Sequence, residues 1–312
     1  MLVFRTFASL WILGVETTST LLIIFIYKMK QGLVLEGGGM RGLFSEGVFD
    51  VLLENGIRLD ALVGVSAGVL FGCNYKSGQI GRGLRYNTKY AKDPRYMSVR
   101  SLLTTGNYVN EKFAYGEMPL KLDKFDFEAF NANDMEFHVT CTDINSGEPV
   151  YKKFVKADET LMDWMRASGS MPLMSKPVTL EGHTMLDGGI VNSIPLEYAQ
   201  SVGLERNIVV LTQPRGYQKK PFKATWLFRM FMSKYPKVAE KMAVRHEMYN
   251  KQLEYVYGEA EKGNVLLIIP DEPLNIGRVE GDADKMRRCY EMGRKKATEM
   301  LEEIRRFYPT KE

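Results

Sequence analysis

The sequence predicts an α/β protein whose central sheet is mainly parallel. Short apolar runs have the length and composition of buried strands, at residues 32–35, 59–63, 207–211 and 265–269. Segments with apolar residues at helical spacing separate these runs, and the order strand, glycine-rich turn, helix occurs twice near the start. Strands that alternate with helices in this way form a parallel sheet covered by helices.

The composition fits one globular domain and excludes several classes of function. A chain of 312 residues with 45% hydrophobic content can bury a substantial core, and its net charge of +4 is too small to indicate nucleic-acid binding. The three cysteines are scattered and form no CxxC pair, so neither a disulfide framework nor a zinc site is predicted. We therefore expect a cytoplasmic protein, with association to a membrane surface left open.

Residues 1–28 differ from the domain that we expect over residues 29–312. Two apolar stretches in this segment flank Glu16, which would cost a few kcal/mol inside a bilayer. No small-residue cleavage site follows them, which argues against a cleaved signal peptide. Two interpretations remain: an extension ahead of a start at Met29, or a weak membrane anchor.

A glycine loop, Gly37-Gly38-Gly39-Met40-Arg41-Gly42, follows the first strand and precedes a helix over residues 43–55. It lacks the Lys-Ser/Thr of a P-loop and a full dinucleotide fingerprint. Consecutive glycines can turn their N–H groups toward an oxyanion, so we interpret Gly37, Gly38 and Gly39 as an oxyanion hole. Arg41 would add positive charge near the oxyanion or a lipid phosphate. A merely tight turn is the alternative.

The second strand ends in Gly64-Val65-Ser66-Ala67-Gly68, followed by another apolar helix. A serine at such a strand-to-helix turn has its hydroxyl lifted clear of the sheet, which is the arrangement of a nucleophile elbow. Gly64 and Gly68 are expected because a Cβ there would strike a neighbouring strand or helix. Ser66 is thus the candidate nucleophile, and the N–H of Ala67 is expected to assist the oxyanion hole.

Two hairpins are predicted in the middle of the chain. Residues 136–143 and 149–154 form the first, a helix over 160–167 follows, and residues 178–180 and 184–186 form the second. The second hairpin ends in Asp187-Gly188-Gly189. A carboxylate at a strand end, followed by two glycines, is well placed to meet a serine, although a structural turn aspartate is the alternative.

A basic segment near residues 215–262 follows the later strand. Between Arg215 and Lys251 ten basic residues face only Glu240 and Glu247, with aromatic and methionine residues among them. This composition suits a lid over an apolar channel or a lip that contacts a membrane surface, and an ordinary packed helix is the alternative. An amphipathic helix over residues 283–307 closes the chain.

The three glycine-containing blocks, in this order, resemble those of the patatin-like phospholipase family. Residues 167–172, Ala-Ser-Gly-Ser-Met-Pro, resemble a fourth family block, with Ser170 in place of a small alanine. The resemblance covers about residues 32–211, and the tail looks like that of bacterial members. It implies a three-layer α/β/α sandwich and hydrolysis of lipid carboxylic esters without a metal or cofactor. The catalytic dyad would be Ser66 and Asp187, supported by Gly42, Gly64, Gly68, Gly188 and Gly189.

The histidines independently favour a dyad over a triad. In α/β-hydrolases the histidine follows the acid in the chain, and only His246 does so here, within the basic segment. His138 and His183 precede Asp187 and are expected to be structural. A lipid-binding or regulatory protein with little turnover is the alternative function, and a protease is a third.

Overall fold

The computed structural model describes residues 29–221, 228–230 and 232–308, and these contain one mixed sheet. Its strands are β1 (Lys30–Leu35), β2 (Ala61–Val65), β3 (Glu136–Asp143), β4 (Pro149–Phe154), β5 (Val178–Leu180), β6 (His183–Asp187), β7 (Leu204–Val210) and β8 (Val265–Ile268). The strands β1, β2, β3, β7 and β8 pair in parallel, while β4, β5 and β6 join antiparallel. Both predicted hairpins are confirmed.

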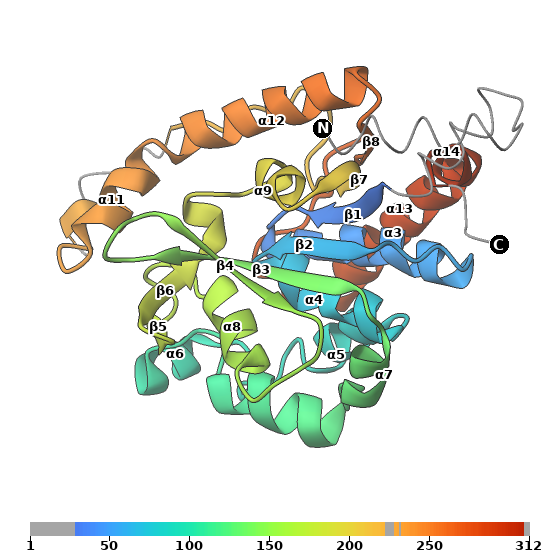
Figure 1. The fold of residues 1–312 in the computed structure, drawn as a ribbon. Coiled ribbons are helices and arrows are strands. Elements are labelled where there is room, and N and C mark those ends of the chain that lie inside the picture. The colour runs from blue at the N-terminus through green and yellow to red at the C-terminus, as the bar shows by residue number, and fades with distance from the viewer. Residues whose placement is uncertain (1–28, 222–227, 231, 309–312) are drawn as a thin grey trace, which may run out of the picture.

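Helices cover both faces of the sheet (Figure 1). On one face lie α3 (Gly42–Glu54), α4 (Ala67–Ser77), α8 (Leu161–Ser168) and α13 (Ala283–Glu299), and on the other lie α9 (Leu196–Ser201) and α12 (Arg245–Glu261). Shorter helical elements complete the described part: η2 (Gly39–Arg41), α5 (Arg82–Lys89), α6 (Val99–Thr105), η3 (Phe113–Leu122), α7 (Phe127–Ala132), η4 (Gly188–Ile190), α11 (Pro236–Ala243) and α14 (Leu301–Phe307).

The alternation of side chains along the buried strands explains the three layers. In β1, Leu33 and Leu35 join the core beneath α3, α4 and α13, whereas Val34 joins the core beneath α9 and α12. Successive side chains of a strand point to opposite faces, and helices cover both faces, so all three are fully buried. The prediction of a three-layer α/β/α sandwich with a mainly parallel sheet is confirmed.

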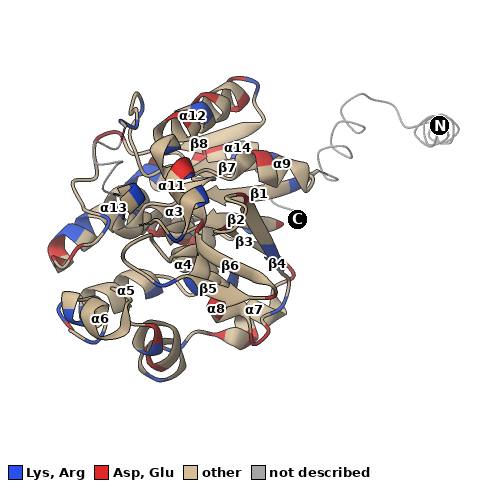
Figure 2. Ribbon diagram, turned by 90° about the vertical axis from the view of Figure 1, so that its left-hand side faces the viewer, with Lys and Arg blue, Asp and Glu red and all other residues tan. Residues whose placement is uncertain are grey.

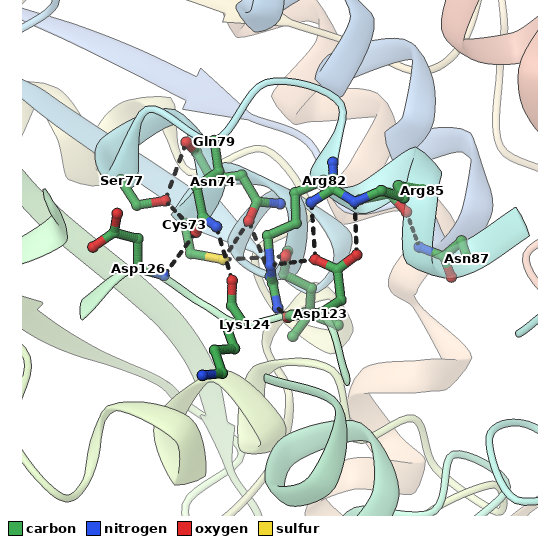
Figure 3. A network of polar contacts seen from close by, with 12 residues as sticks. Cys73, Asn74, Ser77, Gln79, Arg82, Arg85, Asn87, Asp123, Lys124 and Asp126 are labelled. Atoms are coloured by element: carbon green, nitrogen blue, oxygen red, sulfur yellow. Dashed lines mark hydrogen bonds and ion pairs between the residues drawn. The ribbon is translucent and has the colours of Figure 1, made fainter. Parts of the chain in front are cut away.

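The segment between α4 and β3, which the sequence left uninterpreted, is fastened to α4 by Arg82. Its guanidinium donates to Asn74 Oδ1 at 3.1 Å and to the Asp123 carbonyl at 2.7 Å, and it forms an ion pair with the Asp123 carboxylate (Figure 3). It also lies over the rings of Tyr86 and Phe125. This buried, paired arginine, the first residue of α5, therefore fastens α5 and the loop at Asp123 to α4.

The expectation for the closing helix differs from the structure, and the expectations for residues 1–28 lie outside the described residues. The closing helix is not continuous over residues 283–307, because Met300 separates α13 from α14. Residues 1–28 lie outside the described residues, as do 222–227 and 231 of the basic segment. Within the described ranges, no helix is long and apolar enough to cross a membrane. Described helices of the basic segment, α11 and α12, carry charges of both signs (Figure 2).

Candidate active site

The pairing of β3 brings Ser66 and Asp187 together. β4 occupies one edge of β3 along residues 137–142, so the other edge is shared by β2 over residues 136–140 and by β6 over 141–143. β2 runs parallel to β3 and ends at Val65, whereas β6 runs antiparallel and ends at Asp187. These two strand ends therefore meet head to head, and Ser66 Oγ donates a hydrogen bond to Asp187 Oδ2 at 2.7 Å.

Ser66 sits on a strained turn between β2 and α4. Its backbone has φ 54° and ψ −120°, a region that costs a non-glycine residue on the order of 1–3 kcal/mol. The Ser66 N–H donates to Ser168 Oγ at 2.8 Å, and that hydroxyl donates to the Thr140 carbonyl at 2.7 Å. A Cβ at Gly64 would lie 2.8 Å from the Gly68 carbonyl carbon, so α4 can start this close to β2 only with glycine there.

Asp187 is buried and bonded through both carboxyl oxygens. Oδ1 accepts from the Gly189 N–H at 2.7 Å while Oδ2 accepts from Ser66. Burial raises the pKa of this carboxyl above its ordinary value, and the hydrogen bonds from Ser66 and Gly189 and the charges of Arg245 and Arg278 oppose the rise. A carboxylate with a raised pKa is a better proton acceptor than an exposed aspartate.

Three backbone amides beside Ser66 have no acceptor among the described residues: those of Gly38, Gly39 and Ala67. Gly39 adopts φ 59°, a conformation that favours glycine. The next residue fixes the loop, because the Met40 N–H donates to the Arg278 carbonyl at 3.1 Å. The prediction that Gly37 belongs to the oxyanion hole is wrong for its N–H group, because that group donates to the Ser193 carbonyl at 3.3 Å. Three donors therefore remain for a developing oxyanion.

The other residues that the sequence singled out lie around this turn. Arg41 faces the hollow beside the loop, and its Nε donates to Thr212 Oγ1 at 3.3 Å. The remaining glycines of the three blocks are buried in the turns and helix starts that carry Ser66 and Asp187: Gly42, Gly68, Gly188 and Gly189.

Two hollows open on either side of Ser66. The first is apolar and is bounded by side chains of α4, α5, η3 and α8, including Leu70, Tyr86, Ala114, Met118 and Met165. The second combines charged side chains with apolar ones: Glu36, Arg41, Lys219, Arg245 and Arg278 line it together with Tyr249, Ile190, Phe228 and Met242. Ser66 and Gly39 line both hollows, so the hydroxyl lies at their junction.

None of the three histidines bonds to the pair. His138 contacts Tyr198 and Glu136, His183 lies 3.1 Å from Asp143 Oδ2, and His246 lies 3.8 Å from Glu247. Among the described residues, no group of three or more His, Cys, Asp or Glu side chains is placed to hold a metal ion. The group that accepts the hydrogen bond from Ser66 Oγ is Asp187.

Sequence reasoning missed several residues of this site. Ser168 lies in the fourth block, but its role in holding the Ser66 amide depends on spatial contacts. Lys219 and Arg245 were counted within the basic segment without being assigned to the site, and Arg278 belongs to no motif. Tyr249 donates to Glu36 at 2.7 Å across 213 residues of sequence. No local pattern signals such a contact.

Two family models match separate parts of this chain. A patatin-like phospholipase model matches residues 33–199, and a domain of unknown function, DUF6363, matches residues 235–309. The uncharacterized protein YjjU of Escherichia coli is 26% identical over 85% of this chain and 75% of its own length. Lysophospholipase nte1 of Aspergillus fumigatus is 28% identical over 56% of this chain, but the chain spans only 11% of that protein.

Among solved structures, VipD from Legionella pneumophila is similar with a TM-score of 0.44 and 12% identity, over 88% of this chain and 67% of VipD. The patatin-like phospholipase model covers more than half of the 312 residues. The chain therefore belongs to the patatin-like phospholipase family.

Proposed function

We propose that this protein hydrolyses carboxylic esters of lipids through an acyl-enzyme formed on Ser66, with Asp187 as general base. The observation that carries the proposal is the 2.7 Å hydrogen bond from Ser66 Oγ to Asp187 Oδ2, beside three amides without acceptors. Family membership and the lysophospholipase among the relatives support a lipid hydrolase.

The reaction proceeds in two balanced halves. Ser66 Oγ attacks the ester carbonyl carbon while its proton moves to Asp187 Oδ2, and the N–H groups of Gly38, Gly39 and Ala67 stabilise the oxyanion. The tetrahedral intermediate expels the alcohol, whose oxygen takes the proton from Asp187. Water then attacks the acyl-enzyme, Asp187 accepts its proton, and Ser66 leaves with that proton as the fatty acid departs.

The apolar hollow is suited to the acyl chain. Its bounding side chains are mainly methionine, tyrosine and phenylalanine, and several come from α5 and η3, in the segment that Arg82 fastens to α4. Apolar pockets with a few fixed polar groups at one end orient a long apolar ligand toward those groups. The ester carbonyl would thus lie at the junction, where Ser66 is.

The described part of the basic segment supports a peripheral membrane contact. Phe228 and Met232 pack inward, in a cluster with Leu186 and Ile190, whereas Met230 is 57% exposed between exposed basic residues. An apolar side chain among cations is typical of a surface that contacts anionic lipid. We expect Met230→Asp to reduce sedimentation with anionic vesicles, and unchanged sedimentation would remove this contact.

The experiment that tests the proposed activity measures fatty-acid release. Wild-type protein, Ser66→Ala and the control Ser201→Ala, an exposed serine on α9, are incubated with a monoacyl glycerolipid and the products are quantified by mass spectrometry. We expect release by the wild type and by Ser201→Ala only. Full release by folded Ser66→Ala would contradict the proposal, and binding without release by the wild type would favour the lipid-binding alternative.

A further inference from the structure

Four cationic side chains from four separate segments line the second hollow beside Ser66. They are Arg41 of η2, Lys219 of the loop after β7, Arg245 at the start of α12, and Arg278 of the loop before α13. None of the four forms an ion pair with a carboxylate among the described residues. We call the hollow that these four cations line the cationic pocket. Clustered cations that form no close ion pair repel one another, so such an arrangement suits an anionic ligand.

Uncharged contacts hold three of these cations in place, the first being Arg41, whose Nε donates to Thr212 Oγ1. Arg245 donates to the Gly189 carbonyl and, at 2.9 Å, to Ser193 Oγ. The main chain of Lys219 is held by Asn250 at 2.8 and 3.1 Å, and its ammonium lies 4.3 Å from the Tyr249 ring centroid. The positions are therefore set before a ligand arrives, which reduces the entropy cost of binding.

The two carboxyl groups at the pocket are already engaged. Glu36 is 1% exposed and accepts from Tyr249 Oη at 2.7 Å and from the Thr212 N–H and hydroxyl. Asp187 is bonded to Ser66 and Gly189. Neither carboxyl is free to receive the ammonium group of a zwitterionic ligand. The pocket as a whole retains an excess of positive charge.

The pKa values agree with this crowding. Burial, followed by the charges of Arg245 and Arg278, lowers the pKa of Lys219 to about 7. Burial and then Arg278 also lower the pKa of Arg245. An anion placed among these groups would relieve the repulsion and restore full charge on the lysine.

We propose that the cationic pocket binds the phosphate of the substrate's head group and selects phosphomonoester lipids, such as a monoacylglycerol phosphate, over lipids with a choline head. This inference rests on the proposed ester hydrolysis and names its substrate class. A phosphomonoester carries about −1.5 to −2 charges at pH 7 and three acceptor oxygens. One guanidinium group can donate two parallel hydrogen bonds to two of these oxygens. A choline ammonium would instead meet the same cations as a like charge.

The proposal assigns a role to the last third of the chain. Lys219 follows the patatin-like match, which ends at residue 199, and Arg245 and Arg278 lie within the match to the domain of unknown function. The segment before residue 199 supplies Ser66, Asp187 and the oxyanion amides. The later segment would supply the contacts that recognise the head group.

The test compares three substrates with the same acyl chain: a monoacylglycerol phosphate, a monoacylglycerol and a lysophosphatidylcholine. We expect the wild type to favour the phosphomonoester in kcat/KM. Lys219→Gln and Arg278→Gln should each reduce the ratio of phosphomonoester to uncharged substrate about tenfold, and the double variant about 100-fold, because each removes a charged contact to phosphate. The control Lys220→Gln, an exposed neighbour of Lys219, should leave the ratio unchanged. Equal use of the choline lipid, or an unchanged ratio in the double variant, would overturn the proposal.

A binding measurement separates this proposal from the proposed activity. Titration calorimetry of Ser66→Ala protein with glycerol 3-phosphate should show binding that Lys219→Gln and Arg278→Gln together weaken about 100-fold. Absence of ester hydrolysis by the wild type with this binding intact would overturn the activity but keep the anion site. Equal binding of inorganic phosphate, together with no preference for the phosphomonoester lipid, would show a free-phosphate site and contradict the lipid assignment.

Discussion

The two hollows beside Ser66 differ in both chemistry and origin. The apolar hollow is lined mainly by methionine, tyrosine and phenylalanine side chains, most of them from residues 66–175. The cationic pocket is lined by four cationic side chains beside apolar ones such as Ile190, Phe228 and Met242, and three of the four cations come from residues after 199. Six of the described residues line both hollows: Gly39, Ser66, Met171, Met174, Arg278 and Val279.

On the proposals above, the acyl chain and the head group are recognised by separate parts of the molecule. A change confined to the apolar hollow should alter acyl preference alone, and a change at Lys219, which lines only the cationic pocket, should alter head-group preference alone. A change at the junction should slow every substrate equally. A variant that shows a mixture of these three patterns would contradict the separation.

The largest effect is expected at the junction. Ser66→Ala and Asp187→Asn should each lower kcat/KM at least about 1,000-fold for charged and uncharged esters alike, because Ser66 forms the acyl-enzyme and Asp187 takes part in every proton transfer. The double variant should be no slower than Ser66→Ala alone, since the two groups act as a unit. Rates with p-nitrophenyl and phosphorylated esters test this. Loss for one substrate class only would contradict a shared junction.

A large side chain in the apolar hollow should change acyl preference only. Ala114 lies on η3 and is 8% exposed, so Ala114→Trp would fill space otherwise open to the acyl chain. At about 0.8 kcal/mol for each methylene, exclusion of two methylenes should reduce the preference for long over short chains roughly tenfold.

The matched control for this substitution is Leu103→Trp, at a position 81% exposed and outside both hollows. Acyl preference is measured with p-nitrophenyl esters of increasing length, and head-group preference with the three glycerolipids. A changed head-group ratio in Ala114→Trp would show that the two hollows are not independent.

The acid limb of the pH dependence, which Asp187 sets, should appear with both substrate classes. Asp187 must be ionised to accept the Ser66 proton, and burial raises its pKa above the ordinary aspartate value of about 3.9. Therefore kcat/KM should fall about tenfold for each pH unit below this raised pKa, and the fall should begin above the ordinary aspartate range. A rate for the uncharged ester that stays constant down to the ordinary value would contradict Asp187 as the base.

Ser168→Ala should have a smaller effect than the changes at Ser66 and Asp187, and an equal one for every substrate. Ser168→Ala leaves the Ser66 N–H without its 2.8 Å acceptor and the Thr140 carbonyl without its donor. An unpaired buried group costs about 1–3 kcal/mol, so we expect kcat to fall up to roughly 100-fold, with about tenfold as the central value, and KM to stay nearly constant. Ser168→Thr, which keeps the hydroxyl, should recover most of the rate if the Oγ is what positions the turn.

Much of the fold could be predicted because its signals are local. The apolar runs around Val34 and Val209 marked buried strands, and the turns at Asn145 and Glu181 marked hairpins. The break at Met300 could not be predicted, because the amphipathic pattern continues through it while the backbone leaves the helical region.

The residues of the site likewise divide into those that local patterns predict and those that they do not. The blocks around Gly38, Ser66 and Asp187 are local patterns and were readable as motifs. The register that sets Asp187 opposite Cys141, just beyond Val65, depends on three strands sharing β3 and has no local signal. The cationic pocket was missed for a related reason, since its members are single residues on four separate segments.

The measurement that tests the central claim most directly is active-site titration with a fluorophosphonate. Peptide mass mapping follows the modification of Ser66 while hydrolysis of a p-nitrophenyl ester is recorded on the same sample. We predict that activity is lost in proportion to modification, with one phosphonyl group per chain, on Ser66. Full hydrolysis by protein whose Ser66 is completely modified, or a folded wild type that takes no label, would contradict the account.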